Sequence, residues 1–205
     1  FVRQWNEVSI EKIGFSLSNN DEYKSSTYKY LPFTAGGTYR KWYGNLESIV
    51  DWTEPDKMHR PRTTYMDLYY KPGLTWNAIT SGNLSCRFYG KGFLFEHAAA
   101  SLFVNPNNNF EDFLAFLNTP VFQTLLKILN PTLNNGAEVV SSVPIILPTN
   151  NITAIVQNNI SISKLDWDSH ETSWDFEENP LVSISKGHDE RKSLAEIVAQ
   201  YNEEW

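Results

Sequence analysis

Residues 105–129 read NPNNNFEDFLAFLNTPVFQTLLKIL, and the hydrophobic period of the chain changes within them from that of strands to that of helices. The Asn and Pro residues at 105–109 are typical of a break between elements. After the break, apolar residues recur at helical spacing. Pro120 is predicted to divide the segment into two helices or to begin the second one, because proline fits only the first turn of a helix. The recurring apolar positions are Phe113, Phe116, Leu117, Val121, Leu125, Leu126 and Leu129.

Upstream of this break the sequence predicts short strands separated by turns. Ala35-Gly36-Gly37 is a turn, because paired glycines permit backbone angles that other residues avoid. Ser81-Gly82-Asn83 and Gly90-Lys91-Gly92 are further turns. The predicted strands are Thr38–Asn45, which is aromatic and basic, and Ser48–Trp52, Thr75–Thr80, Ser85–Tyr89 and Gly92–Phe95.

Downstream of the break the sequence predicts mainly helices. Ile152–Asp168 and Leu194–Trp205 have helical spacing, and Val143–Pro148 is an extended apolar strip that suits an inward-facing strand or a connector. Near the start of the chain, residues 5–14 also have a helical pattern. The predicted fold class is α/β (mixed α+β), with a strand-rich domain backed by helices at residues 1–150 and a helical spacer with an acidic C-terminal segment at 151–205.

The composition is that of a chain with a real core and no disulfide. Hydrophobic residues make up 41% of the 205 residues and aromatic residues 14%. Cys86 is the single cysteine, which excludes an intrachain disulfide and fits a reducing compartment, so we expect a cytoplasmic location. No stretch reaches the roughly 20 apolar residues that span a bilayer, so no membrane partner is expected. Because the chain opens at Phe1, we expect a piece of a longer protein.

Charge is distributed unevenly along the chain. The net charge is -7, yet residues 35–95 hold eight basic and five acidic residues, whereas residues 165–205 hold eleven acidic and three basic ones. Arg60 and Arg62 are among the basic residues of the first segment. A DNA-binding face can therefore lie on residues 35–95, while the acidic tail faces other proteins or other parts of the same protein.

No catalytic signature is present in the sequence. It has no phosphate-binding loop, no Gly-x-Gly-x-x-Gly and no His-Glu-x-x-His. Methylation of an exocyclic amine requires Asn/Asp-Pro-Pro-aromatic, and the Asn-Pro pairs at 105, 130 and 179 lack both the second proline and the aromatic residue. The acidic residues between 166 and 178 do not have the spacing of a calcium loop and suit a solvated face. We therefore expect no catalytic residue, no metal and no cofactor in this chain.

A binding signature remains, in which cations alternate with aromatic rings and amides. Arg and Asn side chains can read base edges, and Lys can hold phosphates. The alternative is an ordinary strand with cations that face solvent. The candidate DNA-binding residues are Arg40, Lys41, Tyr43, Asn45, Lys71, Trp76, Arg87 and Lys91.

These segments resemble one protein family. Residues 36–45 (GGTYRKWYGN), 71–76 (KPGLTW), 87–95 and 116–134 resemble the target-recognition region of the PglX family of BREX-type adenine-specific DNA methyltransferases. The ending VPIILP at 143–148 is similar to specificity domains of type I and type IIG restriction-modification systems. Residues 166–176 (DWDSHETSWDF) resemble the segment that follows this region and are the most specific part. The resemblance covers most of residues 30–182.

The resemblance implies a sequence-specific DNA recognition module in phage defence. An S-adenosylmethionine-dependent catalytic methyltransferase domain would lie elsewhere in the parent protein, and that domain, double-stranded DNA and other defence-system proteins would be its partners. Two alternatives stay open. One is the specificity subunit of a type I restriction system. The other is a protein-interaction module without DNA binding, of which an antirestriction DNA mimic would be a variant.

Overall fold

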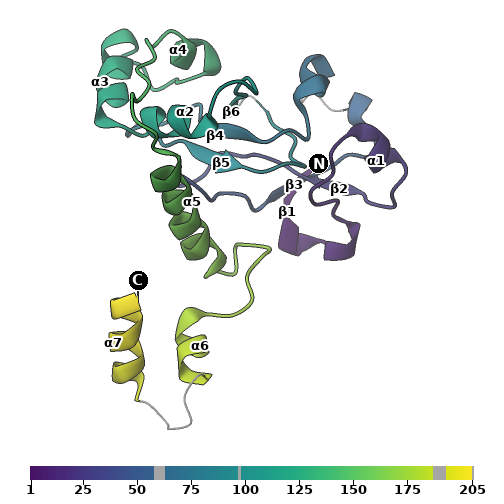
Figure 1. The fold of residues 1–205 in the computed structure, drawn as a ribbon. Helices are drawn as coiled ribbons and strands as arrows, with labels where there is room; N and C mark the ends of the chain where they lie inside the picture. Colours follow the sequence, from purple (N-terminus) through teal and green to yellow (C-terminus); the bar gives the residue numbers. More distant parts are fainter. Residues whose placement is uncertain (58–62, 97, 187–192, 205) are drawn as a thin grey trace.

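Two small antiparallel sheets form the centre of the molecule (Figure 1). The computed structural model describes residues 1–57, 63–96, 98–186 and 193–204; Arg60 and Arg62 lie outside these ranges. The first sheet has the order β1-β3-β2, and Val50 in its central strand pairs with both Val2 and Leu31. The second has the order β5-β4-β6. The strands are β1 (Val2–Gln4), β2 (Tyr30–Pro32), β3 (Ser48–Asp51), β4 (Gly73–Asn77), β5 (Arg87–Tyr89) and β6 (Ala99–Leu102).

A short backbone connection joins the two sheets. The amide of Leu94 donates to the carbonyl of Pro32 (2.9 Å), and the amide of Thr34 donates to the carbonyl of Leu94 (2.9 Å). The predicted strand Gly92–Phe95 is therefore reduced to an isolated bridge beside the end of β2. This bridge lies over a core in which Leu31, Val50 and Leu94 are fully buried.

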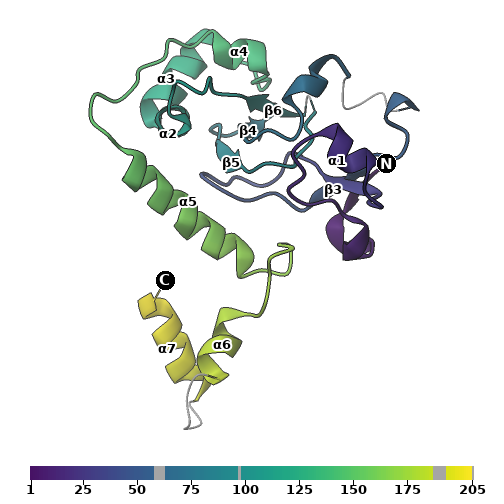
Figure 2. The same ribbon diagram turned by 45° about the vertical axis from the view of Figure 1, so that its right-hand side comes forward.

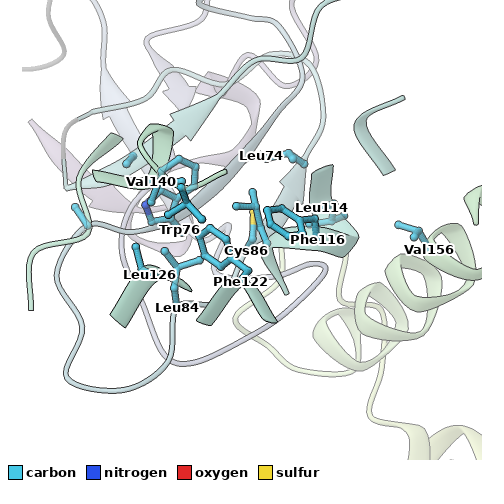
Figure 3. Packing of buried hydrophobic residues seen from close by; sticks show 14 of the residues in the cluster. Leu74, Trp76, Leu84, Cys86, Leu114, Phe116, Phe122, Leu126, Val140 and Val156 are labelled. Carbon is cyan, nitrogen blue, oxygen red and sulfur yellow. The ribbon is translucent and has the colours of Figure 1, made fainter. Parts of the chain in front are cut away.

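The main core lies between the second sheet and a helical layer (Figure 3). Helix α2 (Phe110–Leu117) and helix α3 (Pro120–Leu129) pack Leu114 and Phe122 against Leu74 and Trp76 of β4. Thr119 caps α3 by accepting from the amide of Phe122, and Pro120 occupies the first turn. The prediction that Pro120 begins a second helix is confirmed.

Helix α5 (Thr153–Asp168) covers one side of this body, and its residues Val156 and Ile160 complete the main core. After α5 the chain leaves the sheets. Helices α6 (Pro180–Lys186) and α7 (Leu194–Glu204) pack against one another and stand away from the sheets in both views (Figure 2). The predicted helices at 152–168 and 194–205 are confirmed as far as residue 204, while α6 was not predicted.

Other predicted elements are wrong. Residues 38–45 form a loop because Trp42, Gly44 and Asn45 have positive φ angles of 70°, 115° and 57°, which no strand accommodates. Of the two alternatives for the strip at 143–148, the connector is confirmed and the inward-facing strand is wrong, because Ile145 and Ile146 are more than half exposed. Residues 5–14 form 3₁₀ turns in place of a helix. The remaining elements are the 3₁₀ turns Trp5–Glu7, Ile10–Lys12, Pro55–Lys57 and Thr63–Leu68, helix α1 (Asn20–Lys24) and helix α4 (Ala137–Ser141).

Candidate nucleic-acid interface

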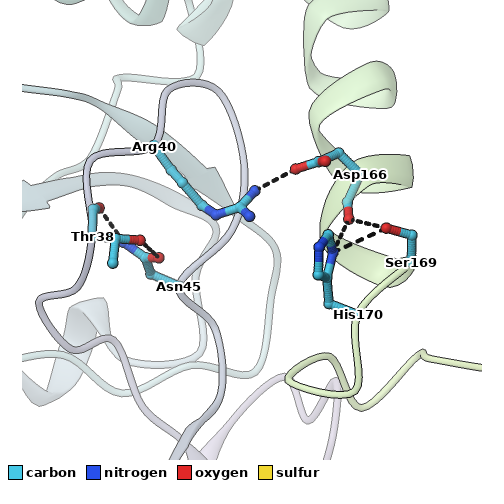
Figure 4. Close-up of polar contacts among 6 residues, drawn as sticks. All are labelled: Thr38, Arg40, Asn45, Asp166, Ser169 and His170. Carbon is cyan, nitrogen blue, oxygen red and sulfur yellow. Dashed lines mark hydrogen bonds and ion pairs between the residues drawn. The ribbon is translucent and has the colours of Figure 1, made fainter. Parts of the chain in front are cut away.

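A hydrogen bond from Asn45 stabilises the loop at residues 38–45. The Asn45 amide donates to the carbonyl of Thr38 at 2.8 Å (Figure 4). Asn45 is 4% exposed. Gly37 packs so closely on Asn45 that a Cβ atom there would lie 2.5 Å from it, which explains the glycine. Asn45 was predicted to contact DNA, but its amide is used inside the loop and is closed off from solvent.

Arg40 and Tyr43 of this loop face α5. One terminal nitrogen of Arg40 lies 2.6 Å from a carboxylate oxygen of Asp166, and the guanidinium lies 5.1 Å from the centre of the Trp167 ring. The ammonium of Lys164 lies 5.3 Å from the Tyr43 ring centre. Arg40 and Tyr43, both predicted DNA contacts, thus hold the loop to a helix of the same chain, and Figure 4 shows the Arg40–Asp166 pair.

Residues 164–176, which we call the acidic clamp, continue this contact. Lys164 pairs with Asp168 and, at 2.9 Å, with Asp175. Burial alone would lower the pKa of Lys164, but its hydrogen bonds to these two carboxylates outweigh that effect and raise the pKa. The Trp174 ring lies 5.1 Å from Phe15 and 5.9 Å from Phe93. Several acidic residues that were expected to be solvated are therefore paired within the chain.

Trp76 and Arg87 are enclosed in the core. Trp76 is 1% exposed, and its indole nitrogen donates to the carbonyl of Asn135 at 2.8 Å. Arg87 is 0% exposed, and one terminal nitrogen donates to the side-chain oxygen of Asn77 at 3.1 Å. Burial lowers the pKa of the Arg87 guanidinium. Neither side chain can reach a base edge in this conformation, so neither belongs to the candidate interface.

The three predicted lysines, Lys41, Lys71 and Lys91, do not form one site. The ammonium of Lys41 donates to the carbonyl of Asn118 at the end of α2 (2.9 Å). Lys71 and Lys91 are exposed, and the backbone bonds that Tyr70 makes with Gly92 and Phe93 bring them to the same end of the second sheet. The structure therefore brings Lys71 and Lys91 together but does not gather the eight predicted residues into one site.

A different surface, at the opposite end of β4, has the chemistry of a nucleic-acid interface. Two hollows of about 90 Å³ and about 240 Å³ adjoin each other there and share Thr80 and Leu84. No Asp or Glu is found among the residues that line them, although the chain carries a net charge of -7. We call this surface the polar ledge; it consists of Tyr39, Asn77, Thr80, Asn83, Ser85, Lys127, Asn130 and Thr132.

Hydrogen bonds within the chain hold several polar side chains of the ledge in place. The ammonium of Lys127 donates to the side-chain oxygen of Asn83 (2.8 Å). This bond does not use the Asn83 amide nitrogen, which can donate to another acceptor. The Asn77 amide exchanges hydrogen bonds with both backbone groups of Gly37, at 3.2 Å and 2.7 Å. Tyr39 is 58% exposed at the rim. Amides, hydroxyls and a lysine are the groups that contact base edges and phosphates.

Sequence reasoning missed the ledge because its residues come from separate segments. Ser81-Gly82-Asn83 has the pattern of a turn, and Lys127 is 44 residues from its partner Asn83. One feature of the sequence could have pointed to the ledge, because residues 68–95 contain no acidic residue. The charge count over residues 35–95 did not reveal this, since its acidic residues all precede residue 68.

The described residues offer neither a metal site nor a membrane-spanning helix. They contain no group of three or more His, Cys, Asp or Glu side chains that could hold a metal ion. None of the helices within these ranges combines the length and the apolar character needed to cross a membrane.

No protein-family model matches the chain. It is 30% identical over 216 residues to the adenine-specific methyltransferase PglX of Lacticaseibacillus casei (strain Zhang), an alignment that covers 100% of this chain and 18% of that protein. It is also 30% identical over 187 residues to the adenine-specific methyltransferase BrxX of Escherichia coli O9:H4 (strain HS), with 89% of this chain and 15% of that protein covered. The chain is therefore homologous to one segment of adenine-specific methyltransferases and spans less than a fifth of the length of these curated relatives.

Proposed function

We propose that this chain is the DNA target-recognition segment of an S-adenosylmethionine-dependent, adenine-specific DNA methyltransferase of the BREX type. The observation that carries the proposal is the polar ledge, a surface without acidic residues on a chain of net charge -7. In this proposal the chain does not catalyse methyl transfer. A catalytic part of the same polypeptide holds the cofactor and receives the flipped adenine.

The ledge suits recognition better than tight electrostatic binding. Its Asn, Ser, Thr and Tyr side chains can exchange hydrogen bonds with base edges, whereas Lys127 is the single exposed cation among its residues. Non-specific affinity for DNA comes mainly from cations that neutralise phosphates. We therefore expect weak binding by the chain alone, with the catalytic part adding most phosphate contacts.

The partners follow from this role. Double-stranded DNA would lie on the ledge, and the acidic clamp would keep α5 in place beside the sheets. Helices α6 and α7 would link to the catalytic part or to other defence-system proteins. The proposed location is the cytoplasm, where the DNA of a bacterial cell is found.

Methylation mapping tests the proposal in cells. Methylated adenines are mapped by long-read sequencing with the gene for this chain intact and deleted, and we expect loss of one short, non-palindromic methylated motif. Exchange of residues 1–150 for the matching segment of a relative should then change the motif. An unchanged methylation pattern after deletion would contradict the proposal.

A binding assay locates the interface. DNA binding of the 205-residue chain is measured by fluorescence anisotropy for Lys127→Ala and for the matched control Lys91→Ala, because both lysines are exposed and lie at opposite ends of β4. We expect Lys127→Ala to weaken binding to all sequences and to lower the salt dependence by about one phosphate contact. If only Lys91→Ala weakens binding, the interface lies at the Lys71–Lys91 end.

One observation favours a second candidate, a protein-interaction module. Ile155, Ile162 and Leu165 of α5 are 65%, 56% and 59% exposed, and exposed apolar side chains gathered on one helix are typical of protein contacts. The anisotropy assay separates the two candidates. Absence of DNA binding at every salt concentration, together with an unchanged methylation pattern, would favour the interaction module.

A further inference from the structure

Arg87 is a buried cation without an ion-pair partner. Its side chain is 0% exposed, and no carboxylate of the described residues lies within the 4.0 Å of an ion pair. Two of its three guanidinium nitrogens, Nε and Nη1, have no hydrogen-bond acceptor. A guanidinium taken out of water is ordinarily paired, because unpaired burial costs several kcal/mol. This arrangement therefore calls for a compensating charge.

The one hydrogen bond of Arg87 points to where that charge would come from. Its third nitrogen donates to the side-chain oxygen of Asn77, and Asn77 lines the smaller hollow of the polar ledge. On the other flank of the Arg87 backbone, the amide of Trp42 donates to the carbonyl of Cys86 and the amide of Phe88 donates to the carbonyl of Trp42. The 38–45 loop thus runs beside Arg87, while Asn77 connects it to the hollow.

Glu47 is the acidic residue whose charge acts on Arg87, and no direct ion pair joins the two. Its attraction opposes the lowering of the Arg87 pKa by burial, but the carboxylate lies beyond ion-pair distance. One Glu47 oxygen is itself buried without a hydrogen-bond partner. Arg87 and Glu47 therefore both hold buried polar atoms without hydrogen-bond partners, and they form no direct ion pair with each other.

The hollow has the size and lining for a small anionic group. Its volume of about 90 Å³ is well below the roughly 300–1,000 Å³ of sites for drug-sized molecules. The residues that line it include Tyr39, Thr80, Ser85 and Asn83, which carry hydroxyl and amide groups, and none of its lining residues is Asp or Glu. Hydroxyl and amide donors backed by a cation are the groups that hold phosphate oxygens.

We propose that this hollow is the seat of one DNA phosphodiester, and that Arg87 acts through Asn77 as the positioning charge beneath it. The inference rests on the proposed function in naming DNA as the source of the phosphate. The anion seat itself depends only on Arg87, Asn77 and the acid-free lining. Free inorganic phosphate should therefore bind there too, more weakly.

The first test uses the unaltered 205-residue chain and inorganic phosphate. Backbone amide signals are followed by NMR as phosphate is added at constant ionic strength. We expect saturable shifts centred on residues 37–39 and 80–85. Absence of saturable shifts, or shifts centred on Lys71 and Lys91, would overturn the seat.

Variants then test the role of Arg87. Asn77→Asp places a carboxylate beside Arg87 and removes the hydrogen bond to the Gly37 carbonyl, so folding is checked first by circular dichroism. In the folded variant phosphate affinity should fall about tenfold. Asn6→Asp makes the same change of net charge at an exposed position and should leave affinity unchanged. Arg87→Met removes the charge without adding one to the hollow and should lower phosphate affinity by at least as much as Asn77→Asp does. Wild-type affinity of folded Arg87→Met would overturn the role of Arg87, and wild-type affinity of both folded variants would overturn the seat as well. If neither variant folds, the phosphate titration of the unaltered chain still decides the seat.

DNA binding by Asn77→Asp separates this inference from the proposed function. We expect a salt slope smaller by about 0.9, the value of one lost phosphate contact. If phosphate binds at the hollow but DNA binds nowhere, the seat stands and the proposed function fails. If DNA binds equally well to Asn77→Asp and to the unaltered chain, the seat fails and the proposed function stands.

Discussion

Arg40 shows how a side chain with DNA-binding chemistry can be used internally. Its guanidinium forms an ion pair with Asp166 and lies over the Trp167 ring. The Arg40 and Asp166 side chains are 26% and 46% exposed, so solvent screens the pair and limits its contribution to stability.

We predict that a double-mutant cycle between Arg40→Ala and Asp166→Ala gives a coupling of about 0.5 kcal/mol in urea unfolding. Arg40→Ala should cost more than this alone, because the contact with Trp167 is lost as well. Lys24→Ala, an exposed charge on α1, is the control and should change little. Unchanged stability of Arg40→Ala together with weakened DNA binding would return Arg40 to the interface.

Trp174 belongs to the acidic clamp and packs on two rings of the body. Because it is half-buried between Phe15 and Phe93, we predict that Trp174→Ala lowers the free energy of unfolding by about 2 kcal/mol. Trp174→Phe keeps a ring and should recover part of the loss. The measurement is urea unfolding, and stability equal to wild type with altered DNA sequence preference would show a role in recognition.

Among the elements, two buried side-chain amides make the backbone hydrogen bonds that a neighbouring strand would otherwise make. The backbone of Leu84 exchanges hydrogen bonds with the Gln123 amide at 2.9 Å and 2.8 Å. Two residues on, the backbone of Cys86 exchanges two 3.0 Å bonds with the Asn118 amide. The segment that leads into β5 is thus tied to α2 and α3 by side chains placed at strand spacing, which satisfies backbone groups that burial would otherwise leave unpaired.

We predict that Asn118→Leu costs about 3 kcal/mol of unfolding free energy, because it leaves a buried N–H group and weakens the hydrogen bonding of two carbonyls. The control Asn109→Leu removes an exposed amide that makes no capping bond and should cost under about 0.5 kcal/mol. Both values come from urea unfolding. Equal costs for the two variants would show that the amide ladder contributes nothing.

Helix α5 offers a matched pair of isoleucines. Ile160 is 8% exposed in the main core, whereas Ile162 is 56% exposed. We predict that Ile160→Ala costs about 2 kcal/mol or more and Ile162→Ala under about 0.5 kcal/mol in urea unfolding. If both changes are neutral, α5 does not pack on the body in solution. A truncation before α5 would also remove this core contact, so any loss of DNA binding by such a truncation has to be compared with its loss of stability.

Helices were predictable from the sequence and strands much less so. The apolar period from Phe110 to Leu129 and the position of Pro120 define α2 and α3 within a residue or two. The strands are only three to five residues long. In β3 the adjacent residues Ile49 and Val50 are both fully buried, so alternation along the strand is absent. β6 begins with Ala99 and Ala100, small residues with no strand signature.

At the scale of the whole molecule, the sequence revealed the charge asymmetry but not its use. The basic segment at 35–95 and the acidic segment after 165 attract one another through Arg40 and Asp166, and Tyr43 and Lys164 extend the same contact. The candidate interface lies elsewhere, on neutral polar residues that only folding gathers. Composition can show that a chain carries opposite charges, but not whether they meet each other or a partner.

The core also sets the response of the whole molecule to alkaline pH. Burial raises the pKa of the Cys86 thiol from 9.0 to about 12 and that of the Tyr70 phenol from 10.0 to about 12. Burial also raises the pKa values of Tyr69 and Tyr89. In the unfolded chain these groups lose protons near their ordinary values, whereas in the folded chain they stay neutral. The unfolded state therefore binds fewer protons above about pH 9, and stability falls as pH rises.

We predict that the free energy of urea unfolding is nearly constant from pH 7 to 8.5. It should then decline through about pH 12, with each group adding up to about 1.4 kcal/mol per pH unit. Cys86→Ala removes the group with the lowest ordinary value, so its decline should begin about one pH unit later than that of the unaltered chain. Identical profiles for the two proteins would mean that the Cys86 thiol ionises within the fold, and that the core beneath the polar ledge opens to solvent.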